Sequence, residues 1–152
     1  MILNTEFDFD AAHRLVGYKG LCSNLHGHIW KVKLQIEGHS DQLDDVGILW
    51  DFTNAKNLKT LFDHKTILKF CEENEKLVTA LHETCGFGSV FMMADNPTAE
   101  NLADVILTYL KMENPELYYS VKIYESPKSC VEASIWELMK ERKILIIRMV
   151  LV

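Results

Sequence analysis

The chain has 152 residues and a net charge of −6, with 48% hydrophobic and 25% charged residues. These values are typical of one globular domain, so we expect a single domain over residues 1–152. The acidic balance, without a block rich in Lys and Arg, excludes the basic surface that nucleic-acid binding requires.

Neither end of the chain has the sequence pattern of a targeting or membrane-spanning segment. The N-terminal MILNTEFDFD lacks the basic and long apolar regions of a secretory signal, and the apolar run KILIIRMVLV is too short and too basic to span a bilayer. The four cysteines show no CxxC pair and no framework spacing, which is typical of thiols in a reducing compartment. We therefore expect a cytoplasmic protein with no membrane partner.

The first elements along the chain are two strands. Alternation of apolar and polar residues predicts strands over 6–13 and 30–37, each with one apolar face. His13 falls on the apolar face of the first strand. Extending the second strand backwards places His26 and His28 on its apolar face as well.

Two helices and an extended segment are predicted next. The first helix is capped by Asp51 or Thr53 and ends near Asp63 and His64. The second is the segment ENEKLVTALHETC, which Gly86 ends. A short extended piece, SVFMM, follows it.

A third helix and a hairpin complete the pattern. The helix begins in NPTAEN, where Asn96 or Thr98 caps it and Pro97 suits its first turn. The alternation in SVKIYE and SCVEASI predicts two paired strands, and Glu125 shares the apolar face of the first, where a carboxylate needs a partner. Strands, then helices, then strands favour an α+β domain over a doubly wound parallel sheet.

The stretch CSNLHGH contains the residues best suited to bind a metal. His26 and His28 are two residues apart, so on a strand both imidazoles point the same way, and Gly27 adds no side chain that could crowd an ion. Three histidines with an open fourth position are a common catalytic zinc set, and His13 is the natural third. The alternative is three hydrogen-bonded histidines with no metal.

Three further features are less specific. Cys22 is either a small buried thiol or, beside a cation, a base or nucleophile with a lowered pKa. Asp63 and His64 are an adjacent carboxylate and imidazole, a combination that is usually incidental. Glu125 is satisfied either by a ligand with paired N–H donors or by a distant Lys or Arg.

Five motifs in fixed order, FDFDAAH, CSNLHGH, FDH, PTAEN and IYES, resemble those of the 6-pyruvoyltetrahydropterin and 6-carboxytetrahydropterin synthase family. The resemblance covers residues 6–136 and leaves 137–152 as a C-terminal extension. It implies a tunnelling fold, in which an antiparallel four-stranded sheet with helices on one face assembles into an oligomeric barrel. The implied assembly is a homohexamer of two stacked trimers, with sites between subunits.

The resemblance also assigns roles to individual residues. The ligands of a Zn²⁺ ion are His13, His26 and His28. The catalytic residues are Cys22 as the base and the pair Asp63 and His64 as its relay. The residues that contact the pterin are Glu125 as its anchor, with Thr98 and Glu100 lining the same pocket.

The CxxxHGH spacing resembles the carboxy enzymes of queuosine biosynthesis more than the pyruvoyl enzymes. The implied reaction converts 7,8-dihydroneopterin triphosphate to 6-carboxy-5,6,7,8-tetrahydropterin, acetaldehyde and triphosphate. Two alternatives stay open: a pyruvoyl synthase, which eliminates triphosphate without carbon–carbon cleavage, and a non-catalytic zinc-binding oligomer. The segment 65–95 is longer than in compact bacterial members, and the sequence assigns it no role.

Overall fold

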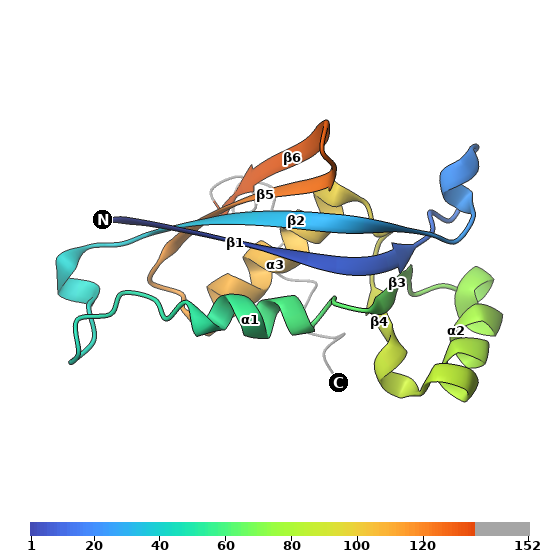
Figure 1. Cartoon of the computed structure of the whole chain (residues 1–152), viewed down its shortest axis with the longest axis horizontal. Helices are drawn as coiled ribbons and strands as arrows, with labels where there is room; N and C mark the ends of the chain where they lie inside the picture. Colours follow the sequence, from blue (N-terminus) through green and yellow to red (C-terminus); the bar gives the residue numbers. More distant parts are fainter. Residues whose placement is uncertain (136–152) are drawn as a thin grey trace.

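The two N-terminal strands run along most of the molecule (Figure 1). The computed structural model describes residues 1–135, in which β1 (Ile2–His13) and β2 (His26–Glu37) pair antiparallel over their full lengths. Alternation decides burial: Phe9, Trp30 and His13 are at most 1% exposed, whereas Ile29, of the opposite parity, is 72% exposed. Both predicted strands are confirmed, including the backward extension of β2 to His26.

The sheet has six strands in the order β4-β3-β1-β2-β5-β6. β5 (Tyr118–Ser126) pairs antiparallel with β2, and β6 (Ser129–Ser134) closes the expected hairpin with β5. On the other side of β1, β3 (Lys65–Lys69) and β4 (Val90–Met93) run parallel to their neighbours. The α+β class is confirmed, but the expected four-stranded antiparallel sheet is wrong in the number of strands and in their directions.

The strand that sequence analysis missed, β3, has no alternation that could reveal it. Thr66, Ile67 and Leu68 are all buried, because strands in the parallel part of a sheet are covered on both faces. A short apolar run of this kind is not distinguished from a buried helix by its pattern alone. The segment 65–95 thus forms β3, α2 (Glu72–Cys85) and β4, and it extends the sheet beyond β1.

Two helices, α1 (Thr53–Thr60) and α3 (Ala99–Glu113), lie on the same side of the sheet (Figure 1). Leu58 of α1 and Leu102, Ile106 and Leu107 of α3 are fully buried in the core that the sheet's inner face completes. α1 ends three residues before Asp63, earlier than expected. No helix among residues 1–135 is both long and apolar enough to cross a membrane.

The ends of the helices follow local chemistry. Gly86 ends α2 as predicted, with a φ of 87° that favours a residue without Cβ. Thr98 caps α3, and its hydroxyl accepts the Asn101 N–H at 3.3 Å. Pro97 lies before this cap, so its expected place in the first turn is wrong. Short 3₁₀ turns cover Leu21–Ser23, Ser40–Gln42 and Phe87–Ser89.

Candidate metal centre and active site

Three histidines meet where β1 ends and β2 begins. In the register of these strands His13 lies opposite His26, and His28 lies opposite Ala11. The ligand nitrogens of the three histidines lie within 4.8 Å of one another, and His13 Nε2 is 3.1 Å from His26 Nε2. The structure therefore brings together the three residues expected to bind zinc.

Hydrogen bonds from the second ring nitrogen fix two of the three imidazoles. His13 Nδ1 donates to the Pro97 carbonyl at 2.7 Å, and His26 Nδ1 donates to the Asn24 carbonyl at 2.9 Å. Because a carbonyl oxygen only accepts, both Nδ1 atoms carry a proton, and each Nε2 of a neutral ring presents a lone pair. Two lone pairs that face each other at 3.1 Å repel unless a cation or a proton lies between them.

A metal ion explains this contact better than a proton. Burial is the largest influence on His13 and lowers its pKa. The hydrogen bond to Pro97 and the charge of Glu125 raise this pKa, the charges of His26 and His28 lower it, and the net pKa is lowered. His28 Nε2 is also buried and, within residues 1–135, has no hydrogen-bond partner. Zn–N bonds of about 2.0–2.1 Å place tetrahedral ligand nitrogens about 3.3 Å apart. The three histidines thus fit a zinc ion.

The space for an ion does not come from Gly27. This residue lies between the two β2 histidines and therefore points to the opposite face, where a Cβ would meet the Ala11 carbonyl oxygen at an ordinary 3.6 Å. The reason given for Gly27 from the sequence is wrong. Trp30, which is fully buried, instead supports the site: its ring makes edge contacts with His13 and His28 at centroid distances of 5.1 and 5.5 Å.

Glu125 lies against the histidines. Its Oε1 is 3.5 Å from His13 Nε2 and 3.7 Å from His28 Nε2. The register of β5 with β6 shifts between Tyr124 and Ser126, and the Glu125 side chain is 38% exposed, so the expected burial of this carboxylate is only partial. Among the described residues its ion-pair partners are histidines, and not the distant Lys or Arg that the sequence left open.

Cys22 is half-buried in the 3₁₀ turn that precedes β2. Its carbonyl accepts the Leu15 N–H at 2.8 Å. Cys22 belongs to neither group of possible metal ligands found within residues 1–135. The turn is nevertheless tied to the histidines, because the carbonyl of Asn24, two residues further on, holds the ring of His26.

Asp63 and His64 form a second cluster with Asp10. Asp63 Oδ1 accepts the Asp10 N–H at 3.0 Å and lies 3.3 Å from His64 Nδ1, while Lys59 Nζ is 3.5 Å from Oδ2. Burial acts to raise the pKa of Asp63, but the Asp10 N–H and the charges of Lys59 and His64 together lower it. The carboxylate is therefore held ionised.

The backbone of His64 is unusual. Its φ of 59° makes it the one non-glycine residue in the left-handed region among residues 1–135. Its N–H donates to the Asp10 carbonyl at 2.7 Å, a bond that holds this conformation at the edge of β1. A residue keeps such a strained backbone conformation only where the surrounding structure holds it in place, and this is often at a functional site.

The pair Asp63 and His64 is grouped with the carboxylate of Asp10. Asp10 has the parity opposite to that of His13, and successive side chains of a strand point to opposite faces. The hollow of about 450 Å³ that His64 and Asp10 line nevertheless also reaches His28, one of the predicted metal ligands. One chain therefore places the predicted relay beside Asp10, next to a hollow that extends to His28.

Thr98 and Glu100 begin α3. Thr98 is the N-cap, and Glu100 is exposed in the first turn, where a carboxylate complements the helix dipole. The atom that joins this segment to the histidines is the carbonyl of Pro97. Sequence reasoning missed this role, because a backbone carbonyl leaves no side-chain pattern.

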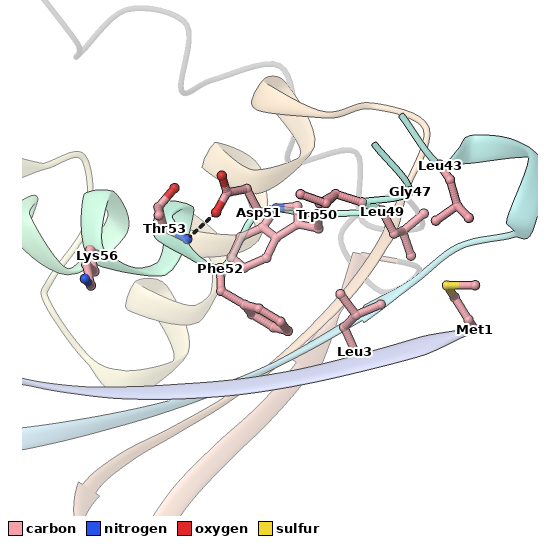
Figure 2. A pocket seen from close by; sticks show the side chains of 11 residues that line it. Met1, Leu3, Leu43, Gly47, Leu49, Trp50, Asp51, Phe52, Thr53 and Lys56 are labelled. Carbon is pink, nitrogen blue, oxygen red and sulfur yellow. Dashed lines mark hydrogen bonds between the residues drawn. The ribbon is translucent and has the colours of Figure 1, made fainter. Parts of the chain in front are cut away.

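A larger hollow, of about 510 Å³, lies between the start of β1 and residues 43–56 (Figure 2). Its lining is mostly apolar and includes Leu3, Leu43, Leu49, Trp50 and Phe52. Its carboxylate, Asp51, already accepts the Thr53 N–H at 2.8 Å. Leu3 and His13 lie near opposite ends of β1, roughly 33 Å apart at the usual rise of a strand. This hollow is therefore separate from the histidine site.

Comparison with known proteins identifies the family. The sequence model of the family described as 6-pyruvoyl tetrahydropterin synthase matches residues 2–135. The chain belongs to this family. A curated member, the 6-carboxy-5,6,7,8-tetrahydropterin synthase of Rickettsia felis, is 33% identical over 138 residues, with 82% of this chain and 94% of the relative covered. The protein of the same name from Haemophilus influenzae is 30% identical over 136 residues, with 86% of this chain and 96% of the relative covered.

Solved structures share the fold of this pterin synthase family. An uncharacterized protein from Wolinella succinogenes matches with a TM-score of 0.70 at 21% identity, covering 89% of this chain and 98% of that chain. The 6-pyruvoyl tetrahydropterin synthase of Plasmodium vivax matches with a TM-score of 0.58 at 20% identity, covering 88% and 98%. At these identities the likeness concerns the fold alone. The family that the five motifs predicted is confirmed.

Proposed function

We propose that the protein is a zinc-dependent 6-carboxy-5,6,7,8-tetrahydropterin synthase of queuosine biosynthesis. It converts 7,8-dihydroneopterin triphosphate and water to 6-carboxy-5,6,7,8-tetrahydropterin, acetaldehyde and triphosphate. The observation that carries the proposal is the 3.1 Å contact between two imidazole nitrogens whose rings both donate through Nδ1. The CxxxHGH spacing and the names of the two curated relatives favour the carboxy product over the pyruvoyl product.

His13, His26 and His28 are the residues that would hold the zinc ion, each through Nε2. When bound, the ion polarises the hydroxyl groups of the substrate side chain and favours their ionised form. The carbonyls of Pro97 and Asn24 keep two of the rings in the required tautomer.

Glu125 is the proposed anchor of the pterin ring. Its two oxygens can accept parallel hydrogen bonds from a ring N–H and the exocyclic amino group of a pterin. Because Oε1 lies 3.5 Å from His13 Nε2, a ring bound there has its side chain beside the histidines. Thr98 and Glu100 are the proposed wall of the same pocket.

Cys22 is the proposed general base, which takes a proton from the substrate side chain. Such a base typically contributes about 10²–10⁴-fold to a rate. Asp63 and His64 group with Asp10, whose side chain is on the face of β1 opposite to that of His13, so we assign their action to the Cys22 thiol of a neighbouring copy. This arrangement requires an oligomer, and the homohexamer implied by the family resemblance supplies such contacts. The four unpaired cysteines support a reducing, cytoplasmic setting.

The test is incubation of the zinc-loaded protein with dihydroneopterin triphosphate, followed by mass analysis of the pterin and assay of acetaldehyde. The metal-stripped protein is the control. A carboxypterin product with acetaldehyde supports the proposal. A pyruvoyl product without acetaldehyde assigns the protein to the other branch of the family, and full zinc occupancy without turnover makes it a non-catalytic zinc-binding oligomer.

A further inference from the structure

Asn96, the second residue before the cap of α3, joins two distant segments of the chain. Its Oδ1 accepts the Val16 N–H at 2.8 Å, and its Nδ2 donates to the Val16 carbonyl at 2.9 Å. Its own carbonyl accepts Asn101 Nδ2 and the Thr98 N–H, both at 2.8 Å. Both polar atoms of the side chain thus bond to one partner residue, and the backbone is anchored to the start of α3.

Val16 belongs to the loop that carries Cys22. The next residue back, Leu15, donates its N–H to the Cys22 carbonyl at 2.8 Å. Every residue from 17 to 21 is exposed, so packing does little to hold this part of the loop. The two bonds from Asn96 and the bond between Leu15 and Cys22 therefore define where the thiol-bearing turn lies.

Pro97 holds the other side of the same site. Its carbonyl accepts His13 Nδ1 at 2.7 Å, so two consecutive residues contact a proposed zinc ligand and the loop of the proposed base. A displacement of Asn96 changes the position of Cys22 relative to His13 without touching either side chain.

We propose that Asn96 is a positioning residue that sets the Cys22 loop against the histidine site. The inference rests on the proposed function, because it concerns the placement of the catalytic thiol. Asn96 contacts no reacting atom, and it acts through Val16 and Leu15. Misplacement of a catalytic group by about 1 Å can cost roughly 10²-fold in rate.

The test compares Asn96→Ala and Asn96→Asp with the wild type, each as the full, zinc-loaded chain. Asn96→Asp keeps an acceptor for the Val16 N–H but sets a carboxylate oxygen against the Val16 carbonyl. Its added negative charge lies before the N-terminus of α3, where it suits the helix dipole. We therefore expect this variant to fold, so that its activity can be measured. Asn114→Asp is the control for the substitution itself: it makes the same change at the opposite end of α3, where the added charge opposes the helix dipole.

We expect kcat to fall about 10- to 100-fold in both Asn96 variants, with KM and zinc content unchanged. Two readouts do not depend on turnover. Amide hydrogen exchange over residues 14–24 should accelerate, and the half-buried Cys22 should react faster with iodoacetamide, followed at its own peptide by mass spectrometry. Asn114→Asp should leave all of these at wild-type values.

Wild-type kcat and loop exchange in Asn96→Ala would overturn the positioning role while the proposed function stands. A loss of zinc in that variant with unchanged exchange over residues 14–24 would also overturn it, because Asn96 would then act on His13 through Pro97. The wild-type protein is assayed before any variant. If it is inactive, the proposed function itself is overturned.

Discussion

His13 Nε2 and His26 Nε2 face each other at 3.1 Å, while the Nδ1 of each ring donates to a backbone carbonyl. The contact follows from the register of β1 and β2, in which these two residues are directly opposite. Two neutral rings in these tautomers repel each other, so a bound cation relieves a conflict that the strand pairing creates. Zinc should therefore stabilise the fold as well as serve the reaction.

The first prediction concerns the metal ligands. His26→Ala should lose zinc affinity by more than the roughly 10–100-fold typical of losing an outer-shell partner, because it removes a ligand itself. Metal analysis after dialysis measures this. His82→Ala, which removes a histidine of α2 outside the cluster, should keep full occupancy. Full zinc content in His26→Ala would remove His26 from the ligand set.

Cys22→Ala should keep zinc and fold but lose turnover by about 10²–10⁴-fold, because the thiol is the proposed base and not a ligand. Turnover and metal content of the same sample decide between these roles. Cys85→Ala, which removes an exposed thiol, is the control and should turn over normally. Zinc loss in Cys22→Ala would instead make the cysteine a fourth ligand and the site a closed, structural one.

Glu125→Gln should weaken pterin binding by about one to two orders of magnitude and leave zinc content unchanged. The amide places an N–H donor where the pterin also donates, so one of the two hydrogen bonds is replaced by a mismatch. Calorimetric titration with biopterin measures the affinity. Glu132→Gln, on β6 where the carboxylate pairs with Lys122, serves as the control. Equal pterin affinity in both variants would mean that another residue anchors the ring.

Mixing two inactive chains should restore activity if the sites lie between subunits. Cys22→Ala lacks the proposed base and His64→Ala lacks the proposed relay; Cys22 lies in the turn before β2, whereas His64 lies at the edge of β1 beside Asp10. After unfolding and joint refolding, roughly one quarter of the sites should combine an intact residue of each kind. The separate variants, refolded in the same way, are the controls. No recovery in mixed oligomers would place the relay and the base within one chain.

Acid should destabilise the metal-free protein. Burial lowers the pKa of His13 below its ordinary value of 6.5, so below about pH 6.5 the unfolded chain binds a proton that the folded chain does not. The free energy of unfolding then falls as the pH falls, until the folded state is protonated too. Urea unfolding between about pH 7 and pH 5 measures this, and zinc release in the same range is expected because protons compete for the ligands.

An NMR titration of the imidazole signals checks the cause of that acid sensitivity. The pKa of His13 should lie below the ordinary histidine value of 6.5, because burial disfavours the charged ring. A His13 signal that titrates at or above 6.5 would attribute the loss of stability to other groups.

Much of the site could be predicted from strand parity. Alternation along β1 and β2 placed His13, His26 and His28 on one face before any contact was known, because side chains of a strand change sides at every residue. The stop at Gly86 and the final hairpin were predicted for the same kind of reason, and Thr98 was one of the two caps expected for α3. In each case the cause is local backbone geometry, which nearby residues decide.

Other features depended on residues far apart in the chain. The strand β3 pairs with β1 across a helix, and the Pro97 carbonyl that fixes the His13 ring is 84 residues away from it. The sequence showed Asp63 and His64 as neighbours of each other, but only the tertiary structure placed them beside Asp10, 53 residues away from Asp63. Local patterns specify which way a side chain points along its own strand, whereas the partner it meets is selected by packing and by backbone hydrogen bonds between distant segments.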